Sequence, residues 1–175
     1  MKTILITGPI GGGKSQVCRI LQAKGYPVYD SDSRTKELYR SRKGLTELLE
    51  KELGVKMENL GIIFTDSDKR ERLEKIVYPL VREDFENFRA AQKGCTAVFL
   101  ESATAWNKPQ FSGCFDSVWL VDAPFETRAG RNPKALQRNS VQNFDGLEAD
   151  ITIINDSSVE ELQRKIETIL WKKQI

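Results

Sequence analysis

The stretch Gly8-Pro9-Ile10-Gly11-Gly12-Gly13-Lys14-Ser15 limits what this chain can fold into more than any other part of the sequence. It follows a β-branched apolar run from Thr3 to Thr7 and precedes a helical pattern, and it matches G-x-x-x-x-G-K-[ST] in full. Glycines let the backbone turn with its N–H groups pointing inward, at the positive end of the following helix. Residues 8–15, called the phosphate loop below, therefore predict a site for a nucleoside triphosphate.

Different residues of the phosphate loop are expected to bind the phosphates and the metal ion. Lys14 places a compact positive charge on the β- and γ-phosphates, and the Ser15 hydroxyl is a ligand suited to Mg²⁺. A plain glycine turn with a solvent-exposed lysine is the alternative interpretation. The residues that we expect to contact the nucleotide are Gly8, Ile10, Gly11, Gly12, Gly13, Lys14, Ser15 and Gln16.

Short apolar runs alternate with helical patterns along the rest of the chain. Four runs follow the first, and they are Pro27–Tyr29, Ala97–Leu100, Val118–Val121 and Ile151–Ile154. This alternation predicts an α/β fold with a doubly wound parallel sheet of five strands. We expect one domain over residues 1–175, with a helical acceptor-binding insert at about 33–94 and a short lid at about 129–146.

Three helical features can be predicted more closely. The chain is charged and helix-prone from Ser33 to about Leu53. An amphipathic pattern runs from Leu73 to Phe88, and Pro79 inside it should kink or divide the helix. The last helix should begin at the capping-box pair Ser157 and Glu160.

Composition excludes several kinds of chemistry. The chain has no His, which rules out Ser-His-Asp hydrolases, Cys-His proteases and His-ligated zinc enzymes. Its 27 basic and 25 acidic residues give a net charge of +2, so we expect neither a nucleic-acid nor a membrane partner. Three cysteines without a CxxC pair favour reduced thiols, and no apolar stretch suits a signal peptide or a membrane span, so we expect a cytoplasmic protein.

Two carboxylates follow the second predicted strand. Asp30 and Asp32 should lie at a strand's carboxyl end, where ligand sites gather in such sheets. A carboxylate there could orient or deprotonate an acceptor hydroxyl and help to hold Mg²⁺ through water. Both residue positions also suit helix N-capping, which is the alternative.

Taken together, these motifs resemble the dephospho-coenzyme A kinase family over nearly the whole chain. The matching segments are GPIGGGKS, GYPVYDSD, Tyr78-Pro79-Leu80, Glu101-Ser102-Ala103, Arg131, Arg138-x-x-x-Gln142 and Ile153-Ile154-Asn155-Asp156. The resemblance implies that ATP, with Mg²⁺, donates its γ-phosphoryl group to the ribose 3′-hydroxyl of a small-molecule acceptor, dephospho-CoA. This reaction is the last step of coenzyme A biosynthesis.

The resemblance also implies roles for particular residues. Asp32 would be the base or the group that orients the hydroxyl. Lys14, Arg131 and Arg138 would neutralise charge on the transferring phosphoryl group, and Asn155 would lie beside the adenine. A solvated surface position is the alternative for both arginines.

The chain departs from the family pattern mainly on the acceptor side. Tyr78 replaces a His, Thr104–Asn107 replaces an apolar stretch that ends in Glu, and the segment from Arg131 to Asp150 is shorter than the usual lid. A deoxynucleoside monophosphate kinase and a non-catalytic nucleotide-binding module are therefore the alternative functions.

Basic and aromatic residues are further candidates for the acceptor site. Dephospho-CoA carries a diphosphate, and the basic residues that could meet it after Asp32 are Arg34, Lys36, Arg40, Arg42 and Lys43. Trp106 lies in a predicted loop and could line the acceptor pocket, whereas Trp119 lies in an apolar run and is expected in the core.

Overall fold

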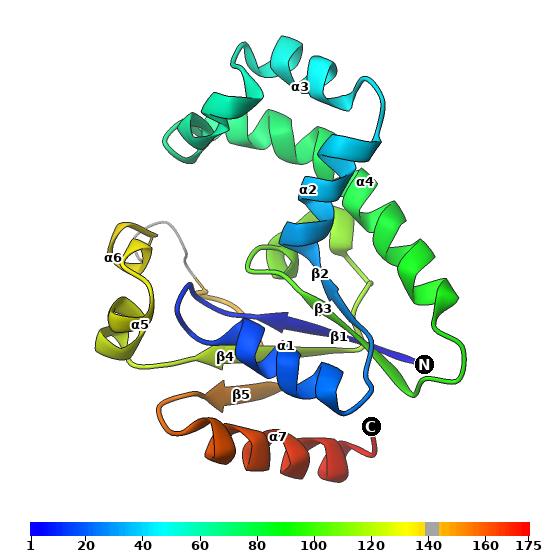
Figure 1. The fold of residues 1–175 in the computed structure, drawn as a ribbon, viewed down its shortest axis with the longest axis vertical. Coiled ribbons are helices and arrows are strands. Elements are labelled where there is room, and N and C mark those ends of the chain that lie inside the picture. The colour runs from blue at the N-terminus through cyan, green and yellow to red at the C-terminus, as the bar shows by residue number, and fades with distance from the viewer. Residues whose placement is uncertain (139–143) are drawn as a thin grey trace. The chain divides into compact units, whose positions relative to one another are not determined.

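The computed structural model describes residues 1–138 and 144–175, and these divide into two compact units (Figure 1). The first unit comprises Met1–Asp30 and Gln92–Ile175, and the second comprises Ser31–Ala91. The second unit overlaps the helical insert expected at about 33–94, whose role in acceptor binding stays a prediction.

One parallel sheet organises the first unit. Its strands are β1 (Lys2–Thr7), β2 (Val28–Asp30), β3 (Ala97–Glu101), β4 (Ser117–Asp122) and β5 (Ile151–Ile154). Their order is β2-β3-β1-β4-β5, and each neighbouring pair is parallel. Because β1 lies inside the sheet and later strands are added on both of its sides, the predicted doubly wound α/β fold is confirmed.

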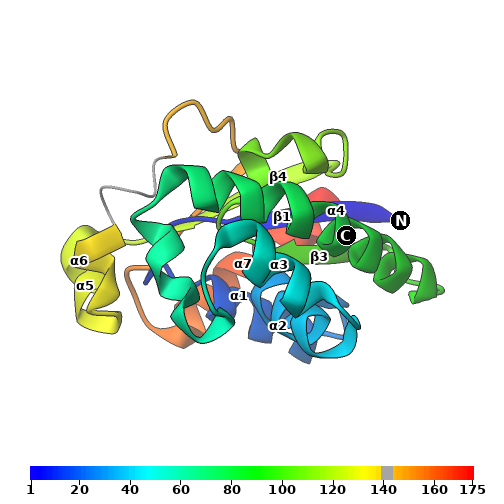
Figure 2. The ribbon, with the colours of Figure 1, turned by 90° about the horizontal axis from the view of Figure 1, so that it is seen from above.

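Helices of the first unit cover one face and one end of this sheet. They are α1 (Lys14–Ala23), α5 (Phe125–Arg131), α6 (Lys134–Arg138) and α7 (Val159–Lys173), with the 3₁₀ turns η2 (Ala105–Asn107) and η3 (Pro109–Phe111). Helices α1 and α7 lie on the same side of the strands (Figure 2), where their apolar faces join one buried cluster. Figures 1 and 2 place α5 and α6 at the end of the sheet opposite to both termini.

Aromatic rings form the centre of the cluster between the sheet and the two helices. Phe99 lies edge-on to Trp119, with ring centroids 5.4 Å apart, and edge-on to Tyr26 at 5.6 Å. The Trp119 side chain is 0% exposed, which confirms the prediction that it belongs to the core. Aromatic pairs of this geometry add stability beyond the area that they bury.

The second unit consists of helices, namely α2 (Ser31–Ser41), α3 (Leu45–Leu53), η1 (Met57–Phe64) and α4 (Ser67–Ala91). The helix-prone stretch from Ser33 to Leu53 is thus two helices, and Gly44 between them adopts a left-handed φ of 79°. Pro79 lies inside α4 and does not divide it. A proline removes only one helical hydrogen bond, while Leu73, Val77, Val81 and Phe85 form one buried stripe on both sides of it.

The start of α7 differs by one residue from the prediction. Ser158, not Ser157, is the N-cap, and its hydroxyl oxygen accepts a hydrogen bond from the Glu161 N–H at 3.2 Å. Two adjacent serines are each followed three residues later by a glutamate, so the capping-box pattern fits both of them. The extended backbone at Ser158 decides between them.

Two tryptophans of opposite exposure test how much the core contributes to stability. We expect Trp119→Ala to lower the free energy of unfolding by about 3–5 kcal/mol, because it leaves a cavity among packed rings. Trp171 is 78% exposed on α7, so Trp171→Ala should change the same quantity by less than about 0.5 kcal/mol. Urea denaturation followed by circular dichroism measures both, and equal losses would contradict the core assignment.

Candidate active site

Strand ends bring polar residues together at one edge of the sheet. The register pairs Ile6 of β1 with Glu101 of β3, and Glu101 with Asp30 of β2. On the other side of β1, Asp122 of β4 pairs with Ile154 of β5, directly before Asn155. Since ligands of such sheets bind outside the carboxyl ends of the strands, the phosphate loop after β1 lies at the centre of the predicted site.

Side chains hold the carbonyl groups of the phosphate loop. The Lys14 ammonium donates to the carbonyl oxygens of Gly8 at 2.9 Å and Pro9 at 3.3 Å. Arg131 Nη1 donates to the Gly11 oxygen at 3.4 Å, and Asn155 Nδ2 donates to the Gly12 oxygen at 3.0 Å. Two of the predicted site residues outside the loop, Arg131 and Asn155, are therefore in contact with it.

Close neighbours explain why glycines recur in this loop. A Cβ on Gly11 would lie 2.6 Å from the Arg128 carbonyl oxygen, and a Cβ on Gly13 would lie 1.9 Å from Asn155 Nδ2. Both glycines also have left-handed backbones, with φ of +80° and +102°. A Cβ on the middle glycine of the run, Gly12, would lie 2.6 Å from the Val121 carbonyl oxygen.

Arg128 is a site residue that the sequence prediction missed. Its Nε donates to the Ala123 carbonyl oxygen at 3.0 Å and lies 3.5 Å from an Asp122 carboxylate oxygen. The guanidinium also lies over the Phe125 ring, 5.5 Å from its centroid. These contacts attach α5 to the end of β4 and seat its backbone against Gly11. An arginine three residues before Arg131, in the same segment, was the available signal.

Negative charge collects beside the loop on the α1 side. Burial first, and then the carboxylates of Glu101 and Asp30, raise the pKa of the Cys18 thiol, which Lys14 lowers by a smaller amount. The thiol therefore stays protonated at neutral pH. Both carboxylates lie close enough to this buried position on α1 to disfavour the thiolate. Glu101 is a second residue without a predicted role, although an apolar strand ending in an acidic residue was a usable signal.

Other predicted residues of the loop lie where the motif requires. Ser15 is exposed on the first turn of α1, and Ile10 and Gln16 are half-buried on either side of the glycines. Arg138 is the last residue of α6, and its side chain lies outside the described part of the structure. The roles of Ser15, Ile10, Gln16 and Arg138 in binding ATP stay predictions.

Asp32 belongs to the second unit, on the first turn of α2, and is exposed. Its charge acts on Tyr39, two turns further along the helix: burial, and secondly Asp32, raise the pKa of that phenol to about 12. Asp30 ends β2 and belongs to the first unit. The predicted pair of carboxylates is thus divided between the units.

Acidic partners on α4 occupy two of the basic residues expected at the acceptor site. Arg34 binds both carboxylate oxygens of Asp84, at 2.8 and 2.6 Å, and Arg42 pairs with Glu83 at 2.5 Å. These bonds fasten α2 and the residue that follows it, Arg42, to α4 within the second unit. The positive charge of Arg34 and Arg42 is therefore partly compensated before any acceptor binds.

Trp106 of η2 is half-buried and stacks on Phe144, with ring centroids 6.0 Å apart and an interplanar angle of 24°. The stack joins the segment after β3 to Phe144, which lies near the end of the predicted lid. Residues 139–143 of that lid lie outside the described residues. A role for Trp106 in an acceptor pocket stays a prediction.

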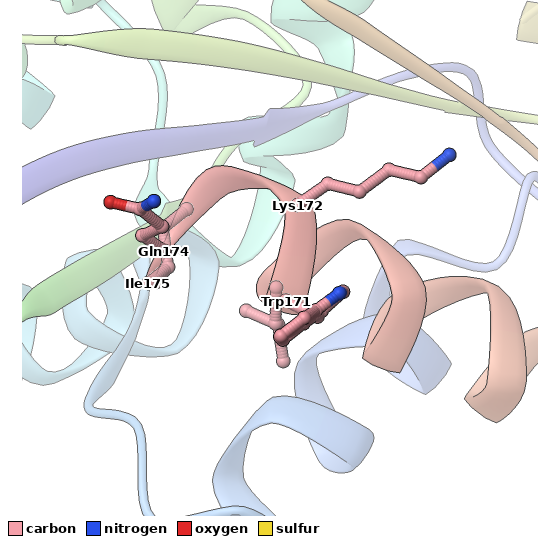
Figure 3. A pocket seen from close by; sticks show the side chains of 5 residues that line it. Trp171, Lys172, Gln174 and Ile175 are labelled. Atoms are coloured by element: carbon pink, nitrogen blue, oxygen red, sulfur yellow. The ribbon is translucent and has the colours of Figure 1, made fainter.

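A surface hollow of about 440 Å³ lies at the far edge of the sheet from the phosphate loop. It is lined by Leu170, Trp171, Lys172, Gln174 and Ile175 at the end of α7, and Figure 3 shows Lys172 extending away from the other labelled side chains. Lys2 at the start of β1 donates to the Lys173 carbonyl oxygen, which places this hollow at the amino ends of the strands. It therefore lies apart from the site described above.

Across residues 1–138 and 144–175, no helix has both the length and the apolar character to span a bilayer. Cys18, Cys95 and Cys114 are free thiols, as the spacing of the cysteines predicted.

Comparisons with known proteins agree with the geometry of the site. A family model described as dephospho-CoA kinase matches residues 2–166. The dephospho-CoA kinase of Porphyromonas gingivalis is 32% identical over 197 residues, covering 99% of this chain and 96% of that protein. The crystal structure of TT1252 from Thermus thermophilus superposes with a TM-score of 0.80 at 27% identity, covering 98% of this chain and 97% of that one.

A more distant structure is similar in fold alone. The dephospho-CoA kinase from Campylobacter jejuni has a TM-score of 0.65 and 19% identity, covering 97% of this chain and 96% of that chain. Its likeness extends over nearly the whole of both chains and shows the fold.

Two glycines of similar backbone conformation test the packing of the loop. We expect Gly13→Ala to weaken ATP binding by about tenfold or more, a difference of about 1.4 kcal/mol, because its Cβ would displace Asn155. Gly25 has a φ of +86° and no atom within 4 Å of a built Cβ. Gly25→Ala should cost about 1–2 kcal/mol of stability and leave ATP affinity unchanged. Isothermal titration calorimetry measures both affinities, and an equal loss in the two variants would contradict the packing argument.

Proposed function

The chain belongs to the dephospho-CoA kinase family, and from this premise we propose that it transfers the γ-phosphoryl group of ATP to the ribose 3′-hydroxyl of dephospho-CoA. The observation that carries the proposal is the family match over residues 2–166. A phosphate loop alone specifies only a nucleoside triphosphate, and the match is what identifies the acceptor. The product of this transfer is coenzyme A, so the reaction is the last step of its biosynthesis.

In this proposal the phosphate loop binds the triphosphate of ATP mainly through backbone N–H groups. Lys14 lies against the loop and can reach the β- and γ-phosphates by exchanging its bonds to the Gly8 and Pro9 carbonyls for phosphate oxygens. Arg131, already beside Gly11, supplies a second positive charge, and we assign a similar role to Arg138. These charges stabilise the transition state, in which negative charge spreads over the γ-phosphoryl oxygens.

Asp32 is our candidate for the group that orients or deprotonates the acceptor hydroxyl. Two observations support it: it follows the β2 end by two residues, and its carboxylate is exposed rather than buried in the second unit. A carboxylate that accepts the hydroxyl proton makes the attacking oxygen a better nucleophile toward the γ-phosphorus. The same step releases ADP, and the proton passes to Asp32.

The residues beside the loop suit Mg²⁺. This ion prefers oxygen ligands and usually keeps several waters, with one or two protein groups and the substrate phosphates. The Ser15 hydroxyl on α1 and the Glu101 carboxylate at the end of β3 are such groups, and the effect of Glu101 on the Cys18 thiol places its charge at this edge. When bound, Mg²⁺ would neutralise negative charge on the β- and γ-phosphate oxygens.

A Mg²⁺ site built from protein alone would need several oxygen ligands in a near-octahedral arrangement. Within the described residues, no cluster of three or more acidic, Cys or His side chains could hold a metal ion. A site completed by ATP and water fits this arrangement.

We also propose a cytoplasmic location, since reduced thiols are usual in that compartment.

A competition between acceptors tests the proposed function. We expect kcat/KM for dephospho-CoA to exceed that for each deoxynucleoside monophosphate at equal ATP, measured by ADP release. Trp106 and Tyr78 replace or flank family positions on the acceptor side, so this comparison examines the part of the chain that departs most. A tenfold preference for any monophosphate, about 1.4 kcal/mol in transition-state binding, would replace dephospho-CoA with that acceptor.

The role of Asp32 can be separated from a simple helix-end effect. We expect Asp32→Asn to lower kcat by about 10²-fold or more, because a general base is lost, while ATP binding stays nearly unchanged. Asp68 is a matched control, since it is an exposed acid on the first turn of α4. Asp68→Asn should cost only about 0.3–1 kcal/mol of stability. If steady-state kinetics and thermal unfolding show the same small effects for both variants, Asp32 serves only the helix end.

A further inference from the structure

We propose that Asn155 is a positioning residue for phosphoryl transfer: its carboxamide holds the Gly12–Gly13 peptide so that the Gly13 N–H faces the phosphates. The inference deepens the proposed function and rests on it for the identity of the nucleotide. It assigns Asn155 to the phosphate loop, whereas the sequence resemblance placed this residue beside the adenine.

The contact between Asn155 and the loop is direct and buried. Nδ2 donates to the Gly12 carbonyl oxygen at 3.0 Å, and the residue is only 5% exposed. The backbone of Asn155 is itself fixed, because its N–H donates to the Asp122 carbonyl oxygen at 2.7 Å. The Asn155 side chain therefore links the phosphate loop to the end of β5, and the Asn155 backbone links that end to β4.

The geometry of the Gly12–Gly13 peptide relates this contact to the direction of the Gly13 N–H. A trans peptide is planar, and its C=O and N–H point in opposite directions. The chain has no cis peptide bond among its described residues. A donor that holds the Gly12 C=O on the outer side therefore directs the N–H of Gly13 to the other side, where the motif presents amides to phosphate.

Gly13 supplies the second observation. A Cβ at this position would overlap Asn155 Nδ2 at 1.9 Å and would lie 3.7 Å from Arg131 Nη1. The carboxamide thus occupies the space that a side chain on residue 13 would need. Gly13 and Asn155 pack directly against each other, although they are 142 positions apart in the sequence.

The chemistry of the contact requires a donor. The Gly12 carbonyl accepts, so an ionised aspartate at position 155 would place two acceptors face to face in a buried site. A protonated aspartic acid has an O–H that can donate to the same carbonyl. The contact can therefore be removed by one substitution and restored by acid, which a contact made only for packing would not permit.

The experiment compares a ligand that contains adenine, ATP, with a ligand that lacks it, tripolyphosphate. Affinities for Mg²⁺–ATP and for Mg²⁺–tripolyphosphate are measured by calorimetry from pH 5 to 8.5, for the wild type, Asn155→Asp and Asn155→Ala. Asn87→Asp is the matched control, because Asn87 is exposed on α4 in the second unit. Dividing each affinity by the wild-type value at the same pH removes the titration of the ligand, and circular dichroism checks folding at each pH.

We expect Asn155→Asp to lower the affinity for both ligands by the same factor at pH 8. The factor should be about tenfold or more, the effect of losing a buried hydrogen bond. The deficit should shrink as the pH falls and the new carboxyl group protonates. Asn155→Ala should show the same equal weakening without pH dependence, and it serves as the test if the aspartate variant does not fold. Asn87→Asp should match the wild type.

Three results would overturn the proposal: weakened ATP binding with unchanged tripolyphosphate binding, unchanged binding of both ligands, or a deficit in Asn155→Asp that does not depend on pH. The first of these would return Asn155 to the adenine. Failure of the wild type to phosphorylate dephospho-CoA would overturn the proposed function instead, and the tripolyphosphate comparison would still decide the role of Asn155.

Discussion

The phosphate loop can bind an anion only if backbone N–H groups point toward the phosphates. This requirement determines which residues of the first unit pack against the loop. Amides that point at an anion leave carbonyls that point away from it, and buried carbonyls need donors. Lys14 serves Gly8 and Pro9, Arg131 serves Gly11 and Asn155 serves Gly12. The Gly13 carbonyl accepts from the first turn of α1. The anion site is thus built from its outer side.

Donors from distant segments can reach these carbonyls only because the strands are parallel and end at one edge. Asn155 follows β5, and Arg131 ends the helix after β4. Close approach then excludes side chains from the loop, as the 1.9 Å and 2.6 Å clashes at Gly13 and Gly11 demonstrate. The glycine run is therefore required by the residues that pack against the loop as well as by the ligand that the loop binds.

The sequence predicted the five strands closely because buried parallel strands are short apolar runs with clear ends. It placed the phosphate loop because the motif is local. It could not assign Asn155 to a loop carbonyl, since that contact depends on which strand ends become neighbours. The anchoring contacts of Arg128 lie within six residues of it along the chain, but no motif identifies them. The cap at Ser158 rather than Ser157 was ambiguous for a different reason, because adjacent serines satisfy the same pattern. Boundaries set by one hydrogen bond are beyond a spacing rule.

Charge is used differently on the two sides of the proposed reaction. In the first unit, a chain of net charge +2 builds its anion site from peptide dipoles and one or two cations aimed at the loop. In the second unit, Arg34 and Arg42 are held by Asp84 and Glu83, so any acceptor phosphate that reached either arginine would compete with a carboxylate for it. Exchange of this kind lowers affinity by the cost of breaking the existing pair. Arg131 and Asn155 are thus held against the phosphate loop by the fold, whereas Lys14 must exchange its carbonyl bonds to bind phosphate. We propose that acceptor binding requires a similar exchange at Arg34 or Arg42.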